Sequence, residues 1–324
     1  MIIREETFET IAGLWSELLP RSPGATVFHT LRWQEAWWRH FGDGAALRLL
    51  SVRDDGFQAV APLMERDRVV SFLGGTDLVD YHDFITSEQP GRGFFDALMS
   101  HVAADGDADA VELLSIPDGS ATLDGLPAAA RAAGWSVEVD LEDVVPRLAL
   151  PSTWDEYMAS LSGKNRHELR RKLRRLEGAG GVRFVEIACA AGIAEGLGDF
   201  AALVRKSSAE KAAFLTPERE RFFGDVAVAL AEEDATRLSF LELDQERVAA
   251  SLSFIHGKDR LLYNSGYDPQ YRRLAVGLLA HALNIRRSID QGLRMYDFMR
   301  GGEPYKYHLG AEDRTIHRIT ARRQ

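Results

Sequence analysis

One stretch in the last third of the chain constrains the fold most, because it is typical of a strand that passes through a turn into a helix. Residues 260–265 predict a strand, and the Asp-Pro pair at 268–269 interrupts it. An apolar run at 278–285 then predicts a helix that begins near Leu274. A β-strand that leads directly into a helix places this part of the chain in a mixed α/β fold.

The turn between this strand and helix is basic and contains a small residue. The first turn of a helix has backbone N–H groups without internal partners, and the helix dipole adds partial positive charge there. Two arginines add charge-assisted hydrogen bonds, and a glycine lets a ligand come close. We therefore predict a phosphate-binding turn formed by Arg272, Arg273, Leu274, Ala275, Val276 and Gly277.

Composition excludes several classes of protein. The chain has 324 residues, 45% of them hydrophobic, which predicts two packed domains or one large one. A net charge of −10 argues against a general nucleic-acid binder, while leaving room for a local basic patch. The single cysteine cannot form an internal disulfide, no apolar run is long enough to span a membrane, and no leader peptide is apparent. We expect a cytoplasmic protein without a structural metal, since the histidines are scattered.

Strand and helix patterns alternate in both halves of the chain. The segment 146–151, with a proline at each end, is the best candidate for a crossover between them. After it the pattern begins again with two helices. We therefore expect an α/β protein with mixed sheets, divided into domains at 1–148 and 149–324.

Several motifs occur in an order that resembles a known superfamily. They are the turn at 272–277 and the segments Phe28–Trp33, Asp80–Asp83, Ser162–Leu176 and Tyr296–Gly310. Together they resemble the GNAT acetyltransferases, in the branch associated with cellulose biosynthesis (CelD-like), which is similar to the Fem-type aminoacyltransferases. In the superfamily the turn has the form Gln/Arg-x-x-Gly-x-Gly/Ala, and here Ala275 replaces its first glycine. The resemblance implies two tandem GNAT-like domains, with acyl-CoA bound by the second and a degenerate, acceptor-binding first domain.

The tail motif Gly301-Gly-Glu-Pro-Tyr-Lys-Tyr-His308 predicts a second part of the site. Two glycines and a proline make an irregular loop, where functional side chains often lie. Fem-type enzymes have a phenylalanine-lysine pair in this loop, and Tyr305-Lys306 is similar to it. The resemblance implies that Lys306 stabilises the oxyanion formed when a nucleophile attacks the acyl carbonyl. An ordinary exposed lysine is the alternative.

Proton transfer requires further groups. Asp297, Glu303 and His308 are candidates for a general base. Asp297 lies in an apolar strand, so pairing with an arginine is its alternative role. Tyr267, or Tyr263, could protonate the leaving thiolate as tyrosines do in many GNAT enzymes. The strand at 250–254 is expected to supply backbone groups to the pantetheine arm of the donor.

Two segments are candidates for binding the acceptor. Asp80, Tyr81 and Asp83 gather carboxylates and a phenol in one loop, although such aspartates also stabilise turns. Arg166 and Arg170 begin a basic row along one helix face, which would hold an anionic group. A solvated face is an equally good interpretation of that row.

The function predicted from these observations is transfer of an acyl group from acetyl-CoA or another acyl-CoA to an amine or hydroxyl on a sugar-derived or other small polar acceptor. Direct attack in a ternary complex would give much of the rate through positioning. Two alternatives stay open. One is a Fem-type transferase that uses aminoacyl-tRNA, and the other is a non-catalytic ligand-binding member of a polysaccharide system.

Overall fold

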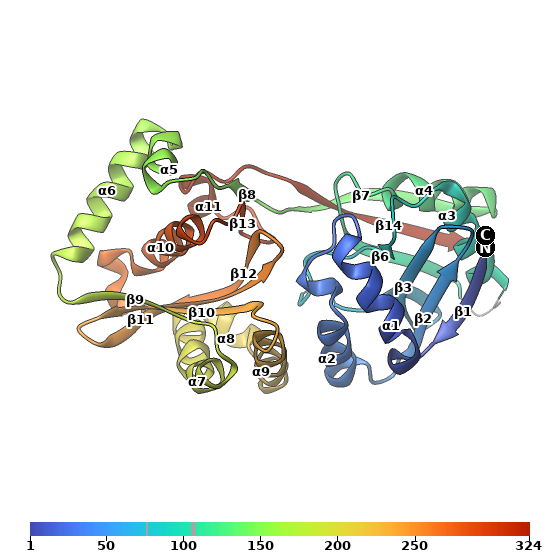
Figure 1. Ribbon diagram of the computed structural model, residues 1–324, viewed down its shortest axis with the longest axis horizontal. Coiled ribbons are helices and arrows are strands. Elements are labelled where there is room, and N and C mark those ends of the chain that lie inside the picture. Colours follow the sequence, from blue (N-terminus) through green and yellow to red (C-terminus); the bar gives the residue numbers. More distant parts are fainter. Residues whose placement is uncertain (76, 105–107) are drawn as a thin grey trace. The chain divides into compact units, whose positions relative to one another are not determined.

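The computed structural model describes residues 1–75, 77–104 and 108–324. The chain forms two compact units, each with its own sheet (Figure 1). The first consists of residues 1–144 together with 314–324, and the second of residues 145–313. Within the described residues, no helix combines the length and apolar character needed to cross a membrane.

The first unit is built on a mixed sheet with the strand order β1-β2-β3-β4-β6-β14-β7, and β5 pairs with β3. Helices α3 and α4 pack against each other over its apolar core, where the phenylalanines at 84, 94 and 95 form edge-on contacts. In chain order its elements are β1 (Ile2–Glu6), α1 (Phe8–Leu18), η1 (Leu19–Arg21), η2 (Val27–His29), α2 (Leu31–Phe41), β2 (Ala46–Arg53), β3 (Gln58–Arg66), β4 (Val69–Phe72), β5 (Ile85–Thr86), α3 (Arg92–Ala104), β6 (Ala110–Pro117), α4 (Thr122–Ala132), β7 (Trp135–Val144) and β14 (Thr315–Arg323).

The second unit has a six-stranded sheet with the order β8-β13-β12-β11-β10-β9. Figure 1 shows α10 on one face of this sheet and α7, α8 and α9 on the other. Its elements are β8 (Arg147–Ala149), α5 (Trp154–Ser160), α6 (Gly163–Glu177), β9 (Val182–Ile187), α7 (Ala190–Ser207), α8 (Ala209–Phe214), α9 (Pro217–Ala231), β10 (Thr236–Leu243), β11 (Glu246–His256), β12 (Asp259–Tyr267), η3 (Pro269–Leu274), α10 (Val276–Asp290), β13 (Met295–Asp297) and α11 (Pro304–His308).

The division of the chain differs from the predicted boundaries at its end. The sequence put residues 149–324 in one domain, but the structure places residues 314–324 in the first unit. The reason is strand pairing, since β14 lies between β6 and β7 and is antiparallel to both. A strand with a partner on each side satisfies its backbone groups fully, and a period-2 pattern cannot say which sheet provides those partners.

In the second sheet, the parallel strands β12 and β13 pair over only a short length. The two strands pair only from Asp259–Met295 to Leu261–Asp297, although β12 continues to Tyr267 beside β11. β12 therefore has one edge that β13 does not cover beyond Leu261. The prediction that residues 250–254 supply backbone groups to the pantetheine arm is wrong, because they lie in β11, which is bonded to β10 on one side and β12 on the other.

Candidate active site

A cavity of about 450 Å³ lies in the second unit beside the end of β12, where β13 no longer pairs with it. This volume is in the range of small-molecule and cofactor sites. The end of β12, the η3–α10 turn, α8 and the start of α11 all contribute to its wall. The lining residues are Lys211, Ala250, Ser265, Gly266, Tyr267, Arg272, Ala275, Val276, Gly277, Leu278, Ala280, His281, Glu303 and Tyr305.

The predicted phosphate turn forms one part of this wall. Helix α10 begins at Val276 rather than near Leu274, because η3 uses the preceding residues for a tighter helical turn. No side-chain cap is bonded to the N-terminus of α10 in the described chain. Arg272, Ala275, Val276 and Gly277 all line the cavity, whereas Arg273 and Leu274 do not contribute to its wall.

Ala275 adopts the backbone conformation that favours glycine. Its φ of 58° lies in the left-handed region, at the position where the superfamily pattern has its first glycine. For a residue with a Cβ, this conformation costs roughly 1–2 kcal/mol. The alanine therefore preserves the shape of the turn at some cost in stability. Gly277 serves close approach instead, because a Cβ there would lie 2.9 Å from Cδ1 of Tyr267.

Lys211 is a cavity residue that the sequence did not reveal. It lies in the short helix α8, which Ser208 caps, and its Nζ donates a hydrogen bond to the carbonyl oxygen of Ser265 on β12. Burial lowers the pKa of this ammonium. In the sequence it is one lysine between polar and alanine residues, and only the fold brings it to the cavity.

His281 and Tyr305 form a stacked pair in the cavity wall. Their ring centroids are 5.0 Å apart with planes inclined by 16°. Burial and the nearby ammonium groups of Lys211 and Lys306 lower the pKa of His281 to about 3, and burial raises the pKa of Tyr305. Sequence reasoning missed His281 because it lies among apolar helical residues, where a histidine usually belongs to the core. Tyr305 was predicted, and it does line the cavity.

Lys306 has structural contacts instead of a place in the cavity wall. Its side chain is buried, and Nζ donates to the carbonyl oxygens of Met299, Arg300 and Gly301 at 3.0, 2.7 and 2.8 Å. It also pairs with Glu303 at 2.9 Å. An ammonium has three protons, and the three carbonyls engage them all. These contacts favour a role in shaping the loop over the predicted role at the oxyanion.

Glu303 and Tyr267 are the predicted proton-transfer residues that the structure does bring to the cavity. The Glu303 side chain remains 56% exposed although it is paired with Lys306. A partly solvated carboxylate within the cavity is able to accept a proton from a nucleophile.

Asp297 has the alternative role considered from the sequence, pairing with an arginine. Its Oδ2 lies 2.8 Å from Nε of Arg147, and its Oδ1 accepts a hydrogen bond from the backbone N–H of Met299. The residue is buried and does not line the cavity. These contacts fix β8 and β13 together, so they favour a structural role over a catalytic one.

The predicted acceptor loop of the first unit is largely structural. Tyr81 is buried near Phe28, and the Asp83 carboxylate accepts hydrogen bonds from the hydroxyls of Ser120 and Thr122. Burial raises the pKa of Asp83 despite those bonds. The first unit has its own cavity of about 420 Å³, and His82 is the one residue of the segment 80–83 in its wall. Asp80 is not part of that wall.

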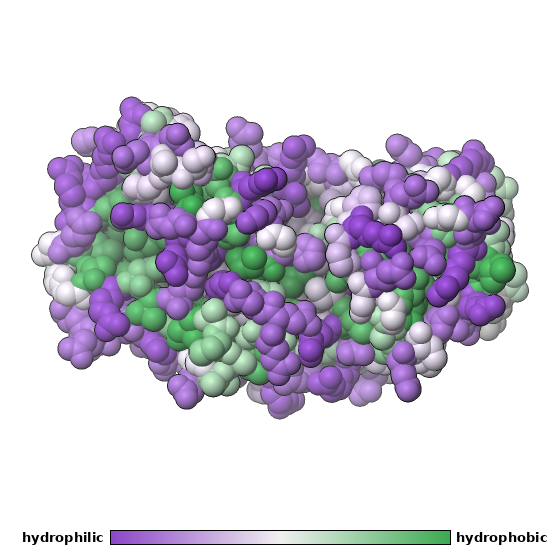
Figure 2. Space-filling view, in the orientation of Figure 1, coloured by the Kyte–Doolittle hydropathy of each residue, from purple (hydrophilic) through white to green (hydrophobic). Residues whose placement is uncertain are grey.

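Arg166 and Arg170 lie on the exposed side of α6. With Arg174 they line an open depression, and Figure 2 shows hydrophilic residues gathered over this helix. Arg171 and Lys172 pair with Glu168, so part of the helix charge is neutralised locally. Another side of helix α6 packs against η3 and α10.

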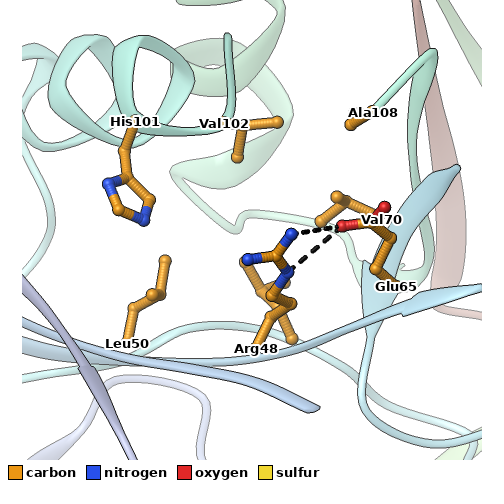
Figure 3. Close-up of a pocket in the computed structure, with 8 residues that line it drawn as sticks. Arg48, Leu50, Glu65, Val70, His101, Val102 and Ala108 are labelled. Carbon is orange, nitrogen blue, oxygen red and sulfur yellow. Dashed lines mark hydrogen bonds and ion pairs between the residues drawn. The ribbon is translucent and has the colours of Figure 1, made fainter. Parts of the chain in front are cut away.

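A third cavity is too small to be a substrate site. Figure 3 shows its residues in the first unit, with Arg48 bonded twice to Glu65 at 2.7 and 3.1 Å. Its volume of about 20 Å³ is enough for roughly one water molecule.

Comparisons with known proteins concern the fold and the second unit. Residues 163–307 match the family described as "Acetyltransferase (GNAT) domain", which includes η3, α10 and most of α11. The fold is similar to the crystal structure of FemX, with 14% identity, a TM-score of 0.69, and coverage of 98% of this chain and 97% of that one. It is also similar to a conserved protein of unknown function from Bacteroides thetaiotaomicron, with 11% identity, a TM-score of 0.64 and full coverage of both chains. A search of curated proteins found no match.

A tandem GNAT protein from the clavulanic acid biosynthesis pathway is a further structural relative. It has 13% identity and a TM-score of 0.50, with 98% of this chain and 97% of that chain covered. At these identities the similarity concerns the fold alone. The expected fold class, two tandem GNAT-like domains with mixed sheets, is confirmed. The match to the acetyltransferase domain family lies within the second unit, and the CelD-like branch stays a prediction.

Proposed function

We propose that this protein is an acyl-CoA-dependent acyltransferase whose donor site is the cavity beside β12. One observation carries the proposal: the N-terminus of α10, which no side chain caps, lies in the cavity wall together with Arg272. A helix N-terminus and a guanidinium group together favour a diphosphate. The match of residues 163–307 to the acetyltransferase domain family supports the same ligand.

The donor would lie along the wall in a defined direction. Its diphosphate would bind at the turn from Arg272 to Gly277, and its pantetheine arm would follow the edge of β12 toward Lys211. Along this edge the carbonyl oxygen of Ser265 already accepts a hydrogen bond from Lys211, and the N–H of Tyr267 already donates to Ser207. The arm would therefore bind mainly through the side chains of the wall. Arg273 and Leu274 would support the turn from outside the wall.

The chemistry we propose is direct transfer. The nucleophilic nitrogen or oxygen of the acceptor attacks the thioester carbonyl, the carbon–sulfur bond breaks, and the acyl group passes to the acceptor. Glu303 would accept the proton that the nucleophile loses, and Tyr267 would donate a proton to the leaving thiolate. Lys306 would hold the loop that carries Glu303. The acceptor class we propose is a sugar-derived or other small polar molecule.

The first test is a calorimetric titration of the purified protein with acetyl-CoA, with ATP as a control for general phosphate affinity. Micromolar binding of acetyl-CoA and much weaker binding of ATP is the expected result. Release of free thiol in the presence of candidate acceptors would then identify the acceptor. Equal affinity for both ligands, or none for acetyl-CoA, would refute the proposed donor.

The basic face of α6 supports a second candidate, transfer from an aminoacyl-tRNA. Three arginines at i, i+4 spacing repel one another on an isolated helix, so a polyanionic ligand would relieve that cost. Two results together would favour this alternative. The protein would bind charged tRNA but not acetyl-CoA, and alanine at Arg166, Arg170 and Arg174 would abolish the tRNA binding. The protein's net charge of −10 opposes it.

A further inference from the structure

The imidazole of His281 is a buried polar group without a hydrogen-bond partner at Nδ1 within the described structure. The residue is 5% exposed, and its ring lines the cavity. Buried polar atoms in native proteins nearly always have a partner, and the exceptions often mark a place where a ligand or water supplies one. The stacked ring of Tyr305 covers one face of the imidazole, and the cavity lies beside the same side chain.

The surroundings of His281 determine what it can do there. Lys211 of α8 and Lys306 of α11 both oppose protonation of the imidazole, and burial opposes it more strongly. The other titratable neighbour is Tyr305, and Glu303 lines the same cavity. A group whose pKa is near 3 holds a proton too weakly to take one from an amine at neutral pH. His281 is therefore unsuited to be the general base, but a neutral imidazole offers one donor and one acceptor nitrogen.

The position of His281 along α10 points to a part of the donor. It lies four residues after Gly277, which corresponds to about 6 Å of helix length from the proposed diphosphate site. The first amide of a pantetheine arm is at a comparable distance from its diphosphate. Val276 and Ala280 make the wall between these points apolar, which suits the methyl and methylene groups of that arm.

We propose that the neutral imidazole of His281 accepts a hydrogen bond from an amide N–H in the pantetheine arm of the acyl donor. This inference rests on the proposed function and adds a positioning residue to it. An amide that leaves water for an apolar wall needs a hydrogen-bond partner, and so does the imidazole. The bond would therefore satisfy both groups and fix how far the thioester reaches toward Lys211 and Glu303.

The test compares two variants with two ligands. His281→Phe keeps a flat ring against Tyr305 but removes the hydrogen bond, and His281→Asn restores a polar group near Nδ1. The ligands are acetyl-CoA and adenosine 3′-phosphate 5′-diphosphate, which is coenzyme A without its pantetheine arm. We expect His281→Phe to weaken acetyl-CoA binding about tenfold, as for the loss of one buried hydrogen bond, with nucleotide binding unchanged. His281→Asn should recover part of that loss.

The nucleotide also shows that each variant is folded at the turn, and ¹⁵N NMR of the wild-type imidazole gives an independent measurement. Its resonances should shift with acetyl-CoA but not with the nucleotide, and should not titrate between pH 5 and 8. The inference fails, and the proposed function stands, if wild type binds acetyl-CoA but His281→Phe binds it equally well or loses both ligands equally. Absence of acetyl-CoA binding in wild type would overturn the proposed function and the inference with it.

Discussion

The two units each contain one parallel strand pair with a cavity beside it, but only one of these pairs leads directly into a helix. In the second unit, β12 ends at Tyr267 and α10 begins at Val276. In the first unit, β4 ends at Phe72 and α3 begins only at Arg92, with β5 in between. A helix N-terminus can bind an anion beside a strand only when the connection is short. The short connection is therefore one reason for proposing the phosphate site in the second unit and not in the first.

The charges of the two cavities reinforce this difference. The cavity of the first unit is lined by Asp67, Asp77 and Glu112 against one arginine, Arg66. The second is lined by Lys211 and Arg272 against Glu303 alone. A diphosphate would be repelled by the first lining and attracted by the second, especially where the walls exclude water. The proposed assignment of donor binding to the second unit follows from both features.

The largest expected difference between the units is in how acetyl-CoA affinity responds when each cavity is filled. Gly277→Val places side-chain atoms against Tyr267 and in the cavity, and we expect acetyl-CoA affinity to fall about 100-fold or more. Ser71→Phe, which fills the cavity of the first unit, should leave that affinity unchanged. Calorimetry on both variants makes the comparison. A larger loss from Ser71→Phe than from Gly277→Val would mean that the donor binds in the first unit, which would refute the proposal.

The two arginines of the turn sharpen the comparison within the second unit. Arg272 lines the cavity and Arg273 does not, so Arg272→Ala should weaken acetyl-CoA binding about tenfold or more and Arg273→Ala much less. The loss for Arg272→Ala should shrink as salt is added, because part of it is electrostatic. Equal losses for the two variants would contradict the geometry of the turn.

Acid pH should act on the two units in opposite directions. Burial raises the pKa of Glu186 in the second unit, but Arg260, Arg287 and Gln291 outweigh it and hold that pKa below its usual value. The Glu186 carboxylate therefore binds a proton less tightly in the folded state than in the unfolded state. It contributes to stability above about pH 4.5, and this contribution is lost as the pH falls through the folded pKa.

Asp83 in the first unit has a raised pKa, so the sign reverses. Its contribution to stability is full below about pH 3.8, the unfolded value, and is lost as the pH rises through the folded pKa. Denaturant unfolding of wild type, Glu186→Gln and Asp83→Asn between pH 3 and 7 would measure both. The stability advantage of wild type over Asp83→Asn should decrease as the pH rises, and that over Glu186→Gln should increase. Parallel trends would refute one of the two assignments.

The smallest expected effect concerns Ala275. Glycine adopts a positive φ without the steric cost of a Cβ, so Ala275→Gly should stabilise the protein by roughly 0.5–1 kcal/mol after its greater unfolded-state entropy is subtracted. The melting temperature measures this. Alanine-to-glycine substitution at Ala282, inside α10, is the matched control and should destabilise. A loss of stability at both positions would mean that the left-handed conformation carries no strain.

Local patterns were sufficient to predict part of this site. The turn from Arg272 to Gly277 is visible because a strand, a break and a helix follow one another along the chain, and its position at the cavity agrees with that pattern. Lys211 and His281 were not predictable in the same way. Lys211 reaches the cavity through the packing of α8 near β12, and His281 has the same spacing as core residues.

The contacts of Lys306 and Asp297 show a second limit of sequence reasoning. Residue type and motif indicate that a charged group is needed, but not whether it binds a ligand or the protein's own backbone. The carbonyls of residues 299–301 surround the Lys306 ammonium only once the loop has folded. Asp297 finds Arg147 on β8, which is far away in the sequence.

The position of β14 affects the order in which the chain can fold during synthesis. Domains usually fold in the order in which they leave the ribosome. Here the first unit lacks the strand between β6 and β7 until residues 315–323 have been made, after the entire second unit. Until then β6 and β7 have unpaired edges, which are prone to aggregate. The unit translated first is therefore the last to be completed, and its nascent form keeps unpaired strand edges until the end of synthesis.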